Sequence, residues 1–484
     1  MPKPPVVVWF RNDLRLADHK ALTAAIATGA PLVLLYVLDD DTPGRWAMGG
    51  ASRWWLAKSL QALMCDIEAR GGRLTLRRGT AASAVAAVAE EAGATAVYFS
   101  RGYEPCAVAT EKTLKAALDA KGVAVKRYGG GLLREPEDVR TKAGEVYKVY
   151  TPFWKALSAG YRAPAHVPAP KALTAHRGAL RSDKLASWAL LPSKPNWAKT
   201  FESEWQPGEA GANERLQTFV ETALAGYAGN RNRPDVAGTS RLSPHLHFGE
   251  IAPSRCWASA LAAASASCNA DRGTETFLKE LVWREFSYTL LFYWPDLPEN
   301  PFRKDFARFP WTKNAAHLKA WEKGRTGYPI VDAGMRELWA RGYMHNRVRM
   351  VVASFLIKHL MIPWQVGEAW FWDTLVDADL ASNAASWQWV AGSGADAAPY
   401  FRIFNPITQG AKFDPDGLYV RRWVPELAKL PAPLIHAPWT APAEILKSAG
   451  IVLGKTYCLP IVDHAAARAR ALQAYEAVKT AAAD

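Results

Sequence analysis

The chain has 484 residues, more than one typical hydrophobic core holds, so we expect two or three domains. Hydrophobic residues make up 49% and charged residues 22%, as in ordinary soluble globular proteins. The net charge of +13 favours a polyanionic partner, nucleic acid ahead of an acidic membrane surface, although an inert basic surface fits the same charge.

The cysteines and the hydropathy exclude several classes of protein. The five cysteines include no C-x-x-C pair and no group of four within one domain, which argues against disulfides and an iron–sulfur cluster and favours a reducing compartment. The N-terminus lacks the basic, apolar and small-residue succession of a signal peptide. The longest apolar run, 351–363, is broken by Lys358 and His359, so we expect a cytoplasmic protein without a membrane span.

The first 130 residues alternate β-branched runs with alanine-rich helical segments. The expected strands are Val6–Phe10, Pro31–Asp39, Arg73–Arg77, Ala96–Ser100 and Val123–Tyr128. Helical spacing occurs between them, for example over 52–69 and 81–92. This alternation predicts an α/β domain, residues 1–130, whose doubly wound parallel sheet is covered by helices on both faces.

Ligands of parallel sheets bind at the carboxyl ends of the strands. Here Arg11, Asn12 and Asp13 follow the first strand, and an acidic run begins at Asp39 after the second. No G-x-G-x-x-G motif follows the first strand, so a dinucleotide site of the usual kind is not supported there.

Beyond this domain the pattern changes twice. Prolines are frequent over 131–207, which predicts a connector that wraps over the surface. From residue 208 strand signals nearly vanish, and amphipathic segments follow at 275–291, 328–340, 348–360 and 366–375. We therefore expect an all-α domain over 208–484.

The segment that ends at Trp389 concentrates acid, amide and indole groups. Asp377 and Asp379 lie close in sequence to Asn383, and Trp387 follows. A carboxylate accepts hydrogen bonds from a ring N–H or a ribose hydroxyl, and an amide both donates and accepts. The segment is a candidate floor for a cofactor pocket; the alternative is a helix with a surface carboxylate pair and a buried tryptophan.

A glycine, three hydroxyls and an arginine occur together in Gly238–Pro244 (GTSRLSP). Hydroxyls and backbone N–H groups of such a loop can hold a pyrophosphate. The Ser243-Pro244 step also suits a helix start, where the helix dipole favours an anion. Taken alone, such a motif is more often a helix cap with an exposed arginine.

Helical spacing places Glu280, Trp283 and Arg284 on one face. A carboxylate, a flat ring and a guanidinium suit the wall of a pocket for a planar, hydrogen-bonding ligand. The alternative is an ion pair between positions i and i+4 beside an amphipathic indole.

A basic segment follows later in the chain. Arg341, Arg347 and Arg349 lie within nine residues and suit contacts with phosphates. A solvated basic helix face is the alternative.

Together these motifs resemble the photolyase/cryptochrome family of flavoproteins. The similar blocks, which occur in the family's order, are Trp9–Arg15, Gly238–Pro244, Trp283–Phe286, Lys323–Asp332, Asn346–Met350, Asp377–Trp389 and Ala397–Pro406. The resemblance covers nearly the whole chain. It implies an α/β antenna domain, a connector and a helical domain that holds FAD.

The resemblance also implies roles for particular residues. The flavin-binding positions are Tyr227, Thr239, Ser240, Arg241, Leu242, Ser243, Phe277, Glu280, Arg284, Asn346, Asp377, Asp379 and Asn383. The positions of the light-driven electron chain to the flavin are Trp311, Trp364 and Trp387. The positions that would meet a DNA lesion are Glu280, Trp283, Asn346, Arg347, Met350 and Trp389.

Three features favour one branch of the family. Asn383 stands where plant cryptochromes carry an aspartate, and an amide cannot donate a proton to the flavin as that acid could, which suits the fully reduced flavin of repair. Asn346 and Met350 stand where (6–4) photolyases would show two histidines. The chain also has no long tail after the family's core. These features favour a bacterial cyclobutane pyrimidine dimer photolyase close to class III.

The expected activity is the light-driven splitting of such dimers in UV-damaged DNA by an electron from reduced FAD. We expect a monomer that associates with the nucleoid when it binds DNA. A cryptochrome-type blue-light receptor without repair is the alternative. For the antenna we favour methenyltetrahydrofolate over a deazaflavin, near Arg11, 39–45 and 101–104; an absent antenna is also compatible with the sequence.

Overall fold

The computed structural model describes residues 3–266, 271–397 and 401–480. By their contacts the residues form two compact units that interleave along the chain. The first unit comprises 1–225, 240–295 and 376–381, and the second comprises 226–239, 296–375 and 382–484. The predicted boundaries at 130 and 207 stay a prediction, because the units follow contacts and not the order of the chain. No described helix combines the length and hydropathy of a bilayer span.

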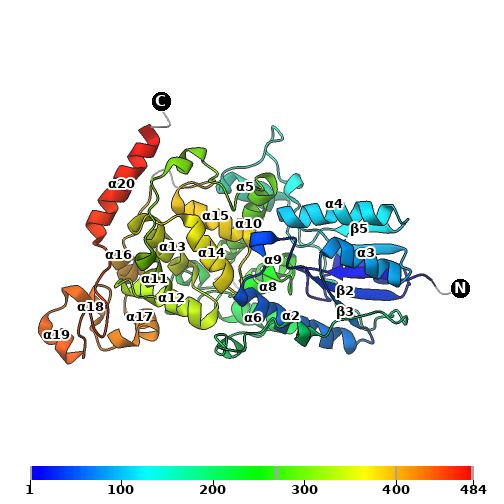
Figure 1. Cartoon of the computed structure of the whole chain (residues 1–484), viewed down its shortest axis with the longest axis horizontal. Helices are drawn as coiled ribbons and strands as arrows, with labels where there is room; N and C mark the ends of the chain where they lie inside the picture. Colours follow the sequence, from blue (N-terminus) through cyan, green and yellow to red (C-terminus); the bar gives the residue numbers. More distant parts are fainter. Residues whose placement is uncertain (1–2, 267–270, 398–400, 481–484) are drawn as a thin grey trace. The chain divides into compact units, whose positions relative to one another are not determined.

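Five short β-branched and aromatic runs form one parallel sheet in the first unit (Figure 1). The strands are β1 (Val6–Phe10), β2 (Leu32–Leu38), β3 (Leu74–Arg78), β4 (Ala96–Ser100) and β5 (Ala124–Tyr128). Their spatial order is β3-β2-β1-β4-β5, and all neighbours are parallel. The predicted doubly wound sheet is confirmed, with strand bounds within one residue of those expected.

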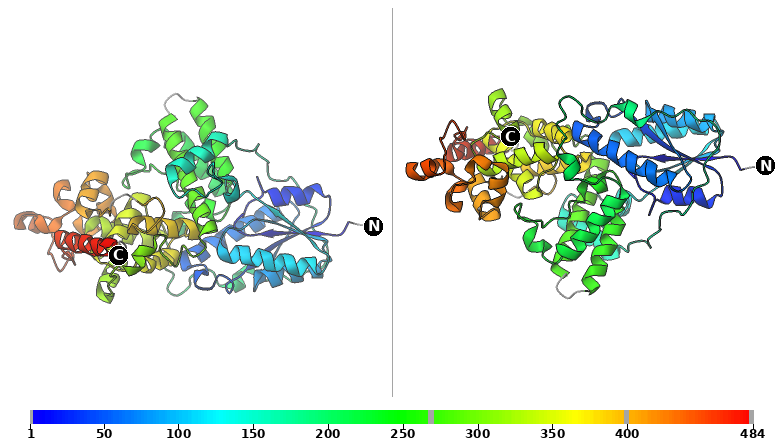
Figure 2. Two further views of the ribbon diagram at one scale, coloured as in Figure 1. Left: turned by 90° about the horizontal axis from the view of Figure 1, so that it is seen from above. Right: turned by 90° about the horizontal axis from the view of Figure 1, so that it is seen from below.

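Helices cover both faces of this sheet because side chains alternate along each strand. Helices α1 (Lys20–Ala27) and α4 (Pro105–Asp119) lie on opposite sides of the strands in Figure 2. Val7 and Trp9 of β1 point into a core that α4 shares with α3 (Ala81–Glu91). Helix α2 (Gly50–Glu68) contacts the edge strand β3.

The rest of the first unit consists of helices and long irregular segments. It contains α5 (Tyr150–Gly160), α6 (Glu209–Thr222), α8 (Ser243–His247), α9 (Pro253–Ala266) and α10 (Asp271–Tyr293). Helix α5 lies inside the predicted connector and packs against α10 through buried Tyr150 and Phe153. This helix was not predicted from the sequence, because the frequent prolines of 131–207 indicated a connector.

The second unit consists of helices and loops in the described residues. Its α-helices are α7 (Tyr227–Asn230), α11 (Ala315–Glu322), α12 (Pro329–Arg341), α13 (Asn346–Ser354), α14 (Trp364–Thr374), most of α15 (Leu380–Ala391), α16 (Pro406–Phe413), α17 (Leu418–Trp423), α18 (Ala432–Ile435), α19 (Ala443–Ser448) and α20 (His464–Thr480). The segment predicted as one helix over 348–360 is α13 followed by a π-helical turn, η6 (Phe355–His359).

Two adjacent polar side chains on α10 hold the chain that follows the sheet. Arg284 Nη1 donates to the Gly131 carbonyl at 2.8 Å, and Glu285 Oε2 accepts from the Leu133 N–H at 2.7 Å. Glu285 is only 2% exposed. Burial raises the pKa of Glu285 to about 7, although the Arg284 charge and the backbone N–H groups oppose this rise. The loop is thereby fixed to α10.

Glu285 should make stability depend on pH. The folded chain keeps the Glu285 proton up to a pKa of about 7, whereas the usual value is 4.5. Its contribution to stability is therefore full below that usual value and is lost as the pH rises through the folded pKa, by on the order of 3 kcal/mol at most. Glu285→Gln cannot ionise, so its thermal midpoint relative to the wild type should rise between about pH 5 and about pH 8.

Glu275→Gln, an exposed position on the same helix, is the control and should follow the wild type. Parallel pH profiles for Glu285→Gln and the wild type would contradict this assignment.

Candidate functional site

Asp379 is the centre of a buried polar network in the first unit. It lies in the turn before α15 and is 7% exposed. The Tyr288 hydroxyl donates to its Oδ2, and His247 Nδ1 lies 3.5 Å from the same oxygen. Burial opposes the charge of Asp379, but His247, Arg284 and Tyr288 outweigh it and hold the pKa of Asp379 below its usual value. An ionised carboxylate is thus kept inside the protein.

Asp377, the second carboxylate, is also 7% exposed. Its Oδ2 accepts from the Ser243 hydroxyl at 2.6 Å. Ser243 begins α8 as expected, with Pro244 in the first turn. The alternative of a surface carboxylate pair is wrong, because Asp377 and Asp379 are both buried. The structure brings the end of the GTSRLSP motif to the acidic segment, as a shared site requires.

The side chain of Arg241 has partners of its own. Its guanidinium lies 4.2 Å from the Trp205 ring centroid and 3.5 Å from Glu204 Oε2. Arg241 also has a positive φ of 52°, and the Leu242 N–H donates to the Ser240 hydroxyl at 3.4 Å. These contacts hold the guanidinium of Arg241 at Trp205 and Glu204. The backbone N–H groups and hydroxyls of the loop are therefore better placed than this guanidinium to donate hydrogen bonds to a phosphate.

Helix α10 carries four predicted site residues. Phe277 is buried against Phe219, and Glu280 is partly exposed. Trp283 is partly exposed and stacks on Tyr150. Arg284 lies one helical turn before Tyr288, with its guanidinium 4.7 Å from that ring.

Tyr288 and His247, the partners of Asp379, were missed by the sequence analysis. Tyr288 follows Arg284 by four residues, so the helix-face argument extended by one turn would have found it. His247 lies in the turn of helix that begins at Ser243 and gave no separate signal.

In the second unit, Tyr227 begins α7 and is 7% exposed, and Thr239 precedes the loop of the first unit. Asn346, the first residue of α13, is exposed, whereas Arg347 and Met350 are partly exposed. All three lie in the first five residues of α13.

His345 is the N-cap residue of α13 and is influenced by the charges of several arginines. Its Nδ1 accepts from the Arg347 N–H at 3.2 Å. Burial, followed by the charges of Arg349, Arg347 and Arg231, lowers the pKa of His345 to about 4. The imidazole is therefore neutral at physiological pH, and the positive charge here comes from arginines, which suits an anionic partner.

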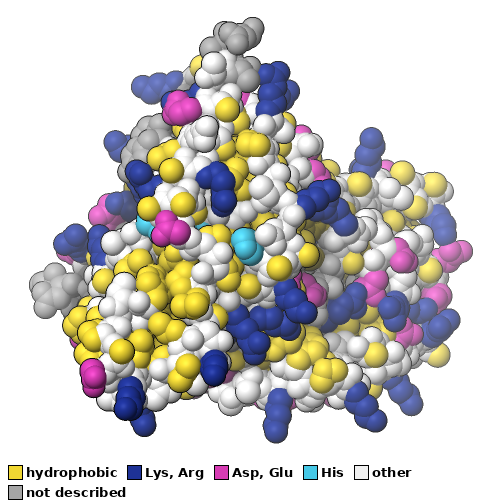
Figure 3. All heavy atoms as spheres, turned by 60° about the vertical axis from the view of Figure 1, so that its left-hand side comes forward, with side chains coloured by type: hydrophobic (Ala, Val, Ile, Leu, Met, Phe, Trp, Pro, Cys, Tyr) yellow, Lys and Arg dark blue, Asp and Glu magenta, His cyan; other side chains and the backbone are white. Residues whose placement is uncertain are grey.

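These arginines are also held in place. Arg347 Nη2 donates to Asn232 Oδ1 at 2.8 Å, and Arg349 Nε donates to the Met344 carbonyl at 2.7 Å. Arg341 lies over the Trp423 ring. Figure 3 shows one face of the molecule, over which Lys and Arg side chains are spread among fewer acidic ones.

Asn383 and Trp387 both belong to α15. Asn383 Nδ2 donates to the Glu368 carbonyl of α14 at 3.0 Å. Trp387 is 2% exposed, and a Cβ at Gly367 of α14 would lie only 2.1 Å from its Cη2 atom. Glycine at this position therefore lets the indole approach the helix backbone. Trp364 lies three residues before Gly367 and shares this face of α14.

The other tryptophans predicted for the electron chain, and Trp389 of the predicted lesion contacts, differ in burial. Trp364 is 2% exposed, whereas Trp311 is partly exposed and packs on Phe309 at 4.4 Å between centroids. Trp389 is partly exposed, and its Nε1 donates to the Asp396 carbonyl at 3.1 Å in the irregular segment after α15. Residues 398–400 of the AAPYFRIFNP motif lie outside the described residues.

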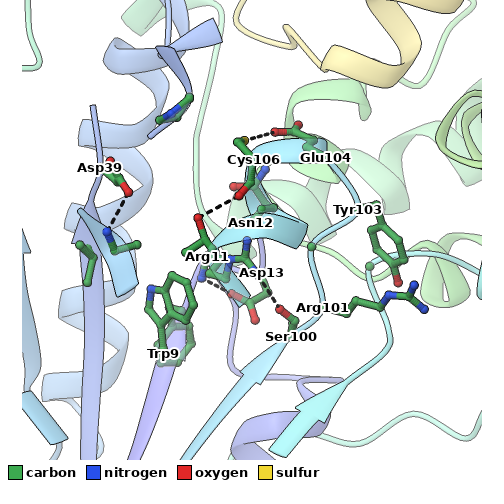
Figure 4. A pocket seen from close by; sticks show the side chains of 18 of the residues that line it. Trp9, Arg11, Asn12, Asp13, Asp39, Ser100, Arg101, Tyr103, Glu104 and Cys106 are labelled. Carbon is green, nitrogen blue, oxygen red and sulfur yellow. Dashed lines mark hydrogen bonds between the residues drawn. The ribbon is translucent and has the colours of Figure 1, made fainter. Parts of the chain in front are cut away.

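A cavity of about 200 Å³ lies at the carboxyl ends of β1, β2 and β4, where the strand order reverses. Arg11, Asp39 and the segment 101–104 line it, as the antenna prediction requires (Figure 4). The expected segment 39–45 contributes Asp39, Thr42 and Pro43 but not Arg45.

The polar groups of this cavity suit a ligand with its own acceptors. Trp9 is buried, and its indole N–H has no hydrogen-bond partner among the described residues. The Arg11 guanidinium lies 4.7 Å from the Trp9 ring centroid. His247, Arg284 and Tyr288 line the cavity too, so the network around Asp379 extends to it.

Two family models match the chain. The model described as DNA photolyase matches residues 6–171, and the FAD binding domain of DNA photolyase matches residues 277–477.

Individual relatives match nearly the full length of this chain. A deoxyribodipyrimidine photo-lyase of Agrobacterium fabrum is 53% identical, with 98% of both chains covered. Cryptochrome-1 of Arabidopsis thaliana is 39% identical over 96% of this chain and 69% of its own length. A crystal structure of a bacterial class III photolyase from Agrobacterium tumefaciens matches with a TM-score of 0.95 and 52% identity, over 99% of this chain and 98% of that one.

Gly367→Ala should disturb the contact between α14 and Trp387. The added Cβ would clash with the indole and with Leu356 Cδ2 at 2.6 Å, and such overpacking costs about 1–3 kcal/mol. Denaturant unfolding measures this loss. Gly229→Ala is the matched control in the same unit, because a Cβ there meets no atom within 4 Å. Equal stability of both variants would show that α15 shifts freely and that the close approach has no structural importance.

Proposed function

Since the chain belongs to the photolyase/cryptochrome family, we propose that it repairs cyclobutane pyrimidine dimers in UV-damaged DNA under blue light. The observation that carries the proposal is the full-length 53% identity to a deoxyribodipyrimidine photo-lyase. Reduced FAD, when bound, would lend the dimer one electron after excitation and take it back once the cyclobutane ring has split. The chain itself binds, orients and shields the reacting groups.

The residues present suit a flavin nucleotide. Asp377 and Asp379 are buried acceptors for hydroxyl or ring N–H groups, and Ser243 adds a hydroxyl beside Asp377. Tyr227 and Phe277 are both buried, and the resemblance implies that their aromatic rings bind the flavin. Asn383 contributes an amide that cannot act as an acid, so a reduced anionic flavin would not be protonated from this position. The remaining predicted flavin residues keep the roles that the resemblance implies.

A dimer within duplex DNA must leave the stack to reach a buried cofactor, at a cost of about a few kcal/mol that is smaller at a damaged site. Trp283 and Trp389 are the proposed apolar walls for the flipped bases, and both are partly exposed. Glu280 would bind the base edge and stabilise developing charge. Asn346 and Met350 would complete the lesion contacts.

The arginines around His345 are the proposed phosphate contacts. Arg347 and Arg349 hold fixed positions through Asn232 and the Met344 carbonyl. Fixed guanidinium groups lose little side-chain entropy when they bind a phosphate. Undamaged DNA should therefore bind weakly through them, and a flipped dimer should add the specific contacts.

Trp387, Trp364 and Trp311 would carry an electron to oxidised flavin from outside the protein. The first two are nearly completely buried, whereas Trp311 is partly exposed, as the solvent end of such a chain must be. Trp311 would be oxidised when its electron moves inward. A reductant in solution would then reduce it again.

The cavity at the strand ends is the proposed antenna site. Its unpartnered Trp9 N–H and its arginines suit a folate with carbonyl and carboxylate groups, and methenyltetrahydrofolate remains our preferred ligand. A deazaflavin is the competing ligand. We further propose that the protein acts as a monomer in the cytoplasm and associates with the nucleoid through its positive charge.

A signalling cryptochrome is the second candidate, favoured by the 39% identity to Arabidopsis Cryptochrome-1. Asn383 distinguishes the two proposals, because an amide cannot supply the proton that an aspartate supplies in that branch.

The purified protein should absorb as a flavoprotein and repair dimer-containing oligonucleotides in blue light after chemical reduction. The readouts are the absorption spectrum and the recovery of intact thymines, with the same sample in darkness as control. Flavin binding without any repair would favour the cryptochrome, and a colourless folded protein would overturn both proposals.

Trp387→Phe should slow the photoreduction of oxidised flavin and leave repair by chemically reduced protein unchanged, because the electron chain is needed only to reduce the cofactor. Transient absorption and the repair assay measure the two rates. Trp321→Phe is the control, since Trp321 lies 6.4 Å from Trp387 but outside the proposed chain. Equal loss of both activities in Trp387→Phe would remove it from the electron chain.

A further inference from the structure

The Trp283 indole is stacked face to face with Tyr150. The two ring centroids are 3.7 Å apart, and the ring planes differ by 4°. Trp283 belongs to α10, whereas Tyr150 is the first residue of α5, which lies in the predicted connector. Both residues are in the first unit. An aromatic pair with parallel rings restrains both side chains, because a rotation of either ring about its Cβ would make the two collide.

Tyr150 is itself held from two sides. Its hydroxyl donates to the Lys279 carbonyl at 2.6 Å, one helical turn before Trp283. Phe286 meets both rings edge-on, at 6.0 Å from Tyr150 and 5.8 Å from Trp283. Tyr150 is 7% exposed, and Phe286 is 1% exposed. The supporting ring therefore has a fixed place in the core between α5 and α10.

Trp283 is partly exposed although Tyr150 covers one of its faces. The accessible surface of the indole therefore belongs to its other face or its edges, because Tyr150 covers the first face. A flat ring that presents one face to solvent and is backed by a second ring is a ready stacking surface for a base. The indole also needs no reorientation when the base arrives, so binding costs less conformational entropy.

We propose that Tyr150 is a positioning residue for lesion recognition, whose ring orients Trp283 so that a single indole face receives the flipped pyrimidine. This inference rests on the proposed function, in which Trp283 is a wall of the lesion pocket. Tyr150 does not touch the dimer. It acts through Trp283, and stacking rather than its hydroxyl is the essential property.

The test compares Tyr150→Phe with Tyr150→Met in the FAD-containing protein. Phenylalanine keeps the ring, whereas methionine fills a similar volume without a flat face. Because an aromatic pair contributes about 0.5–1.5 kcal/mol, Tyr150→Met should weaken the affinity for a dimer-containing oligonucleotide by about two- to twelvefold. Affinity for the undamaged oligonucleotide and the repair yield at saturating dimer should stay unchanged. Tyr150→Phe should bind the dimer within about twofold of the wild type.

Tyr161→Met is the matched control, since Tyr161 follows α5, is equally buried at 7% exposed and contacts Trp257 instead of Trp283. It should leave dimer affinity at the wild-type value. Wild-type affinity in Tyr150→Met, or an equal loss in Tyr150→Phe and Tyr150→Met, would overturn the positioning role. A Tyr150→Met protein that does not fold, beside a folded Tyr150→Phe, would assign Tyr150 to the core alone and overturn it as well.

Trp283→Ala separates this inference from the proposed function. Reduced dimer affinity in Trp283→Ala with unchanged affinity in Tyr150→Met would reject Tyr150 alone. Wild-type dimer affinity in Trp283→Ala would instead reject the role of Trp283 in the lesion pocket, and with it the premise of the inference.

Discussion

A carboxylate that is kept charged inside a protein needs partners from several parts of the chain, and Asp379 imposes this requirement on the first unit. Its partners come from α8, through His247, and from α10, through Tyr288 and the charge of Arg284. Because an unpaired buried charge would cost several kcal/mol of stability, α8 and α10 must both pack against the segment that carries Asp379. Arg284 in turn holds the loop at Gly131, so one network positions the acidic segment and the chain that leaves the sheet.

The polar network around Asp379 connects the proposed flavin site with the cavity at the strand ends, two sites that the sequence analysis treated separately. His247, Arg284 and Tyr288 line the cavity at the strand ends, while Asp379 is a proposed flavin acceptor. A light-harvesting ligand and the cofactor that it serves would then depend on shared polar groups. Arg284, a flavin position according to the family resemblance, is one of the residues that line the cavity proposed for the antenna.

Aromatic packing sets the second constraint, since flat rigid rings can approach only where the backbone allows it. Gly367 lets the Trp387 indole contact α14, and Tyr150 backs the indole of Trp283. Trp387 and Trp283 therefore do more than fill a core. Each of these two indoles has a specific neighbour that restricts its orientation, and orientation is what an electron chain or a stacking wall requires.

Local sequence patterns were enough to predict the strands, the helix start at Ser243 and the residues that share one face of α10. Side-chain periodicity and turn chemistry are properties of short segments. The family was recognisable from its motifs, and the relatives confirm it. Only tertiary structure revealed that Tyr150 supports Trp283, that Arg241 is held by Trp205 and that the two aspartates are buried. These facts join residues far apart in the chain, and such contacts are decided by how helices pack and where charges are compensated, which no local pattern contains.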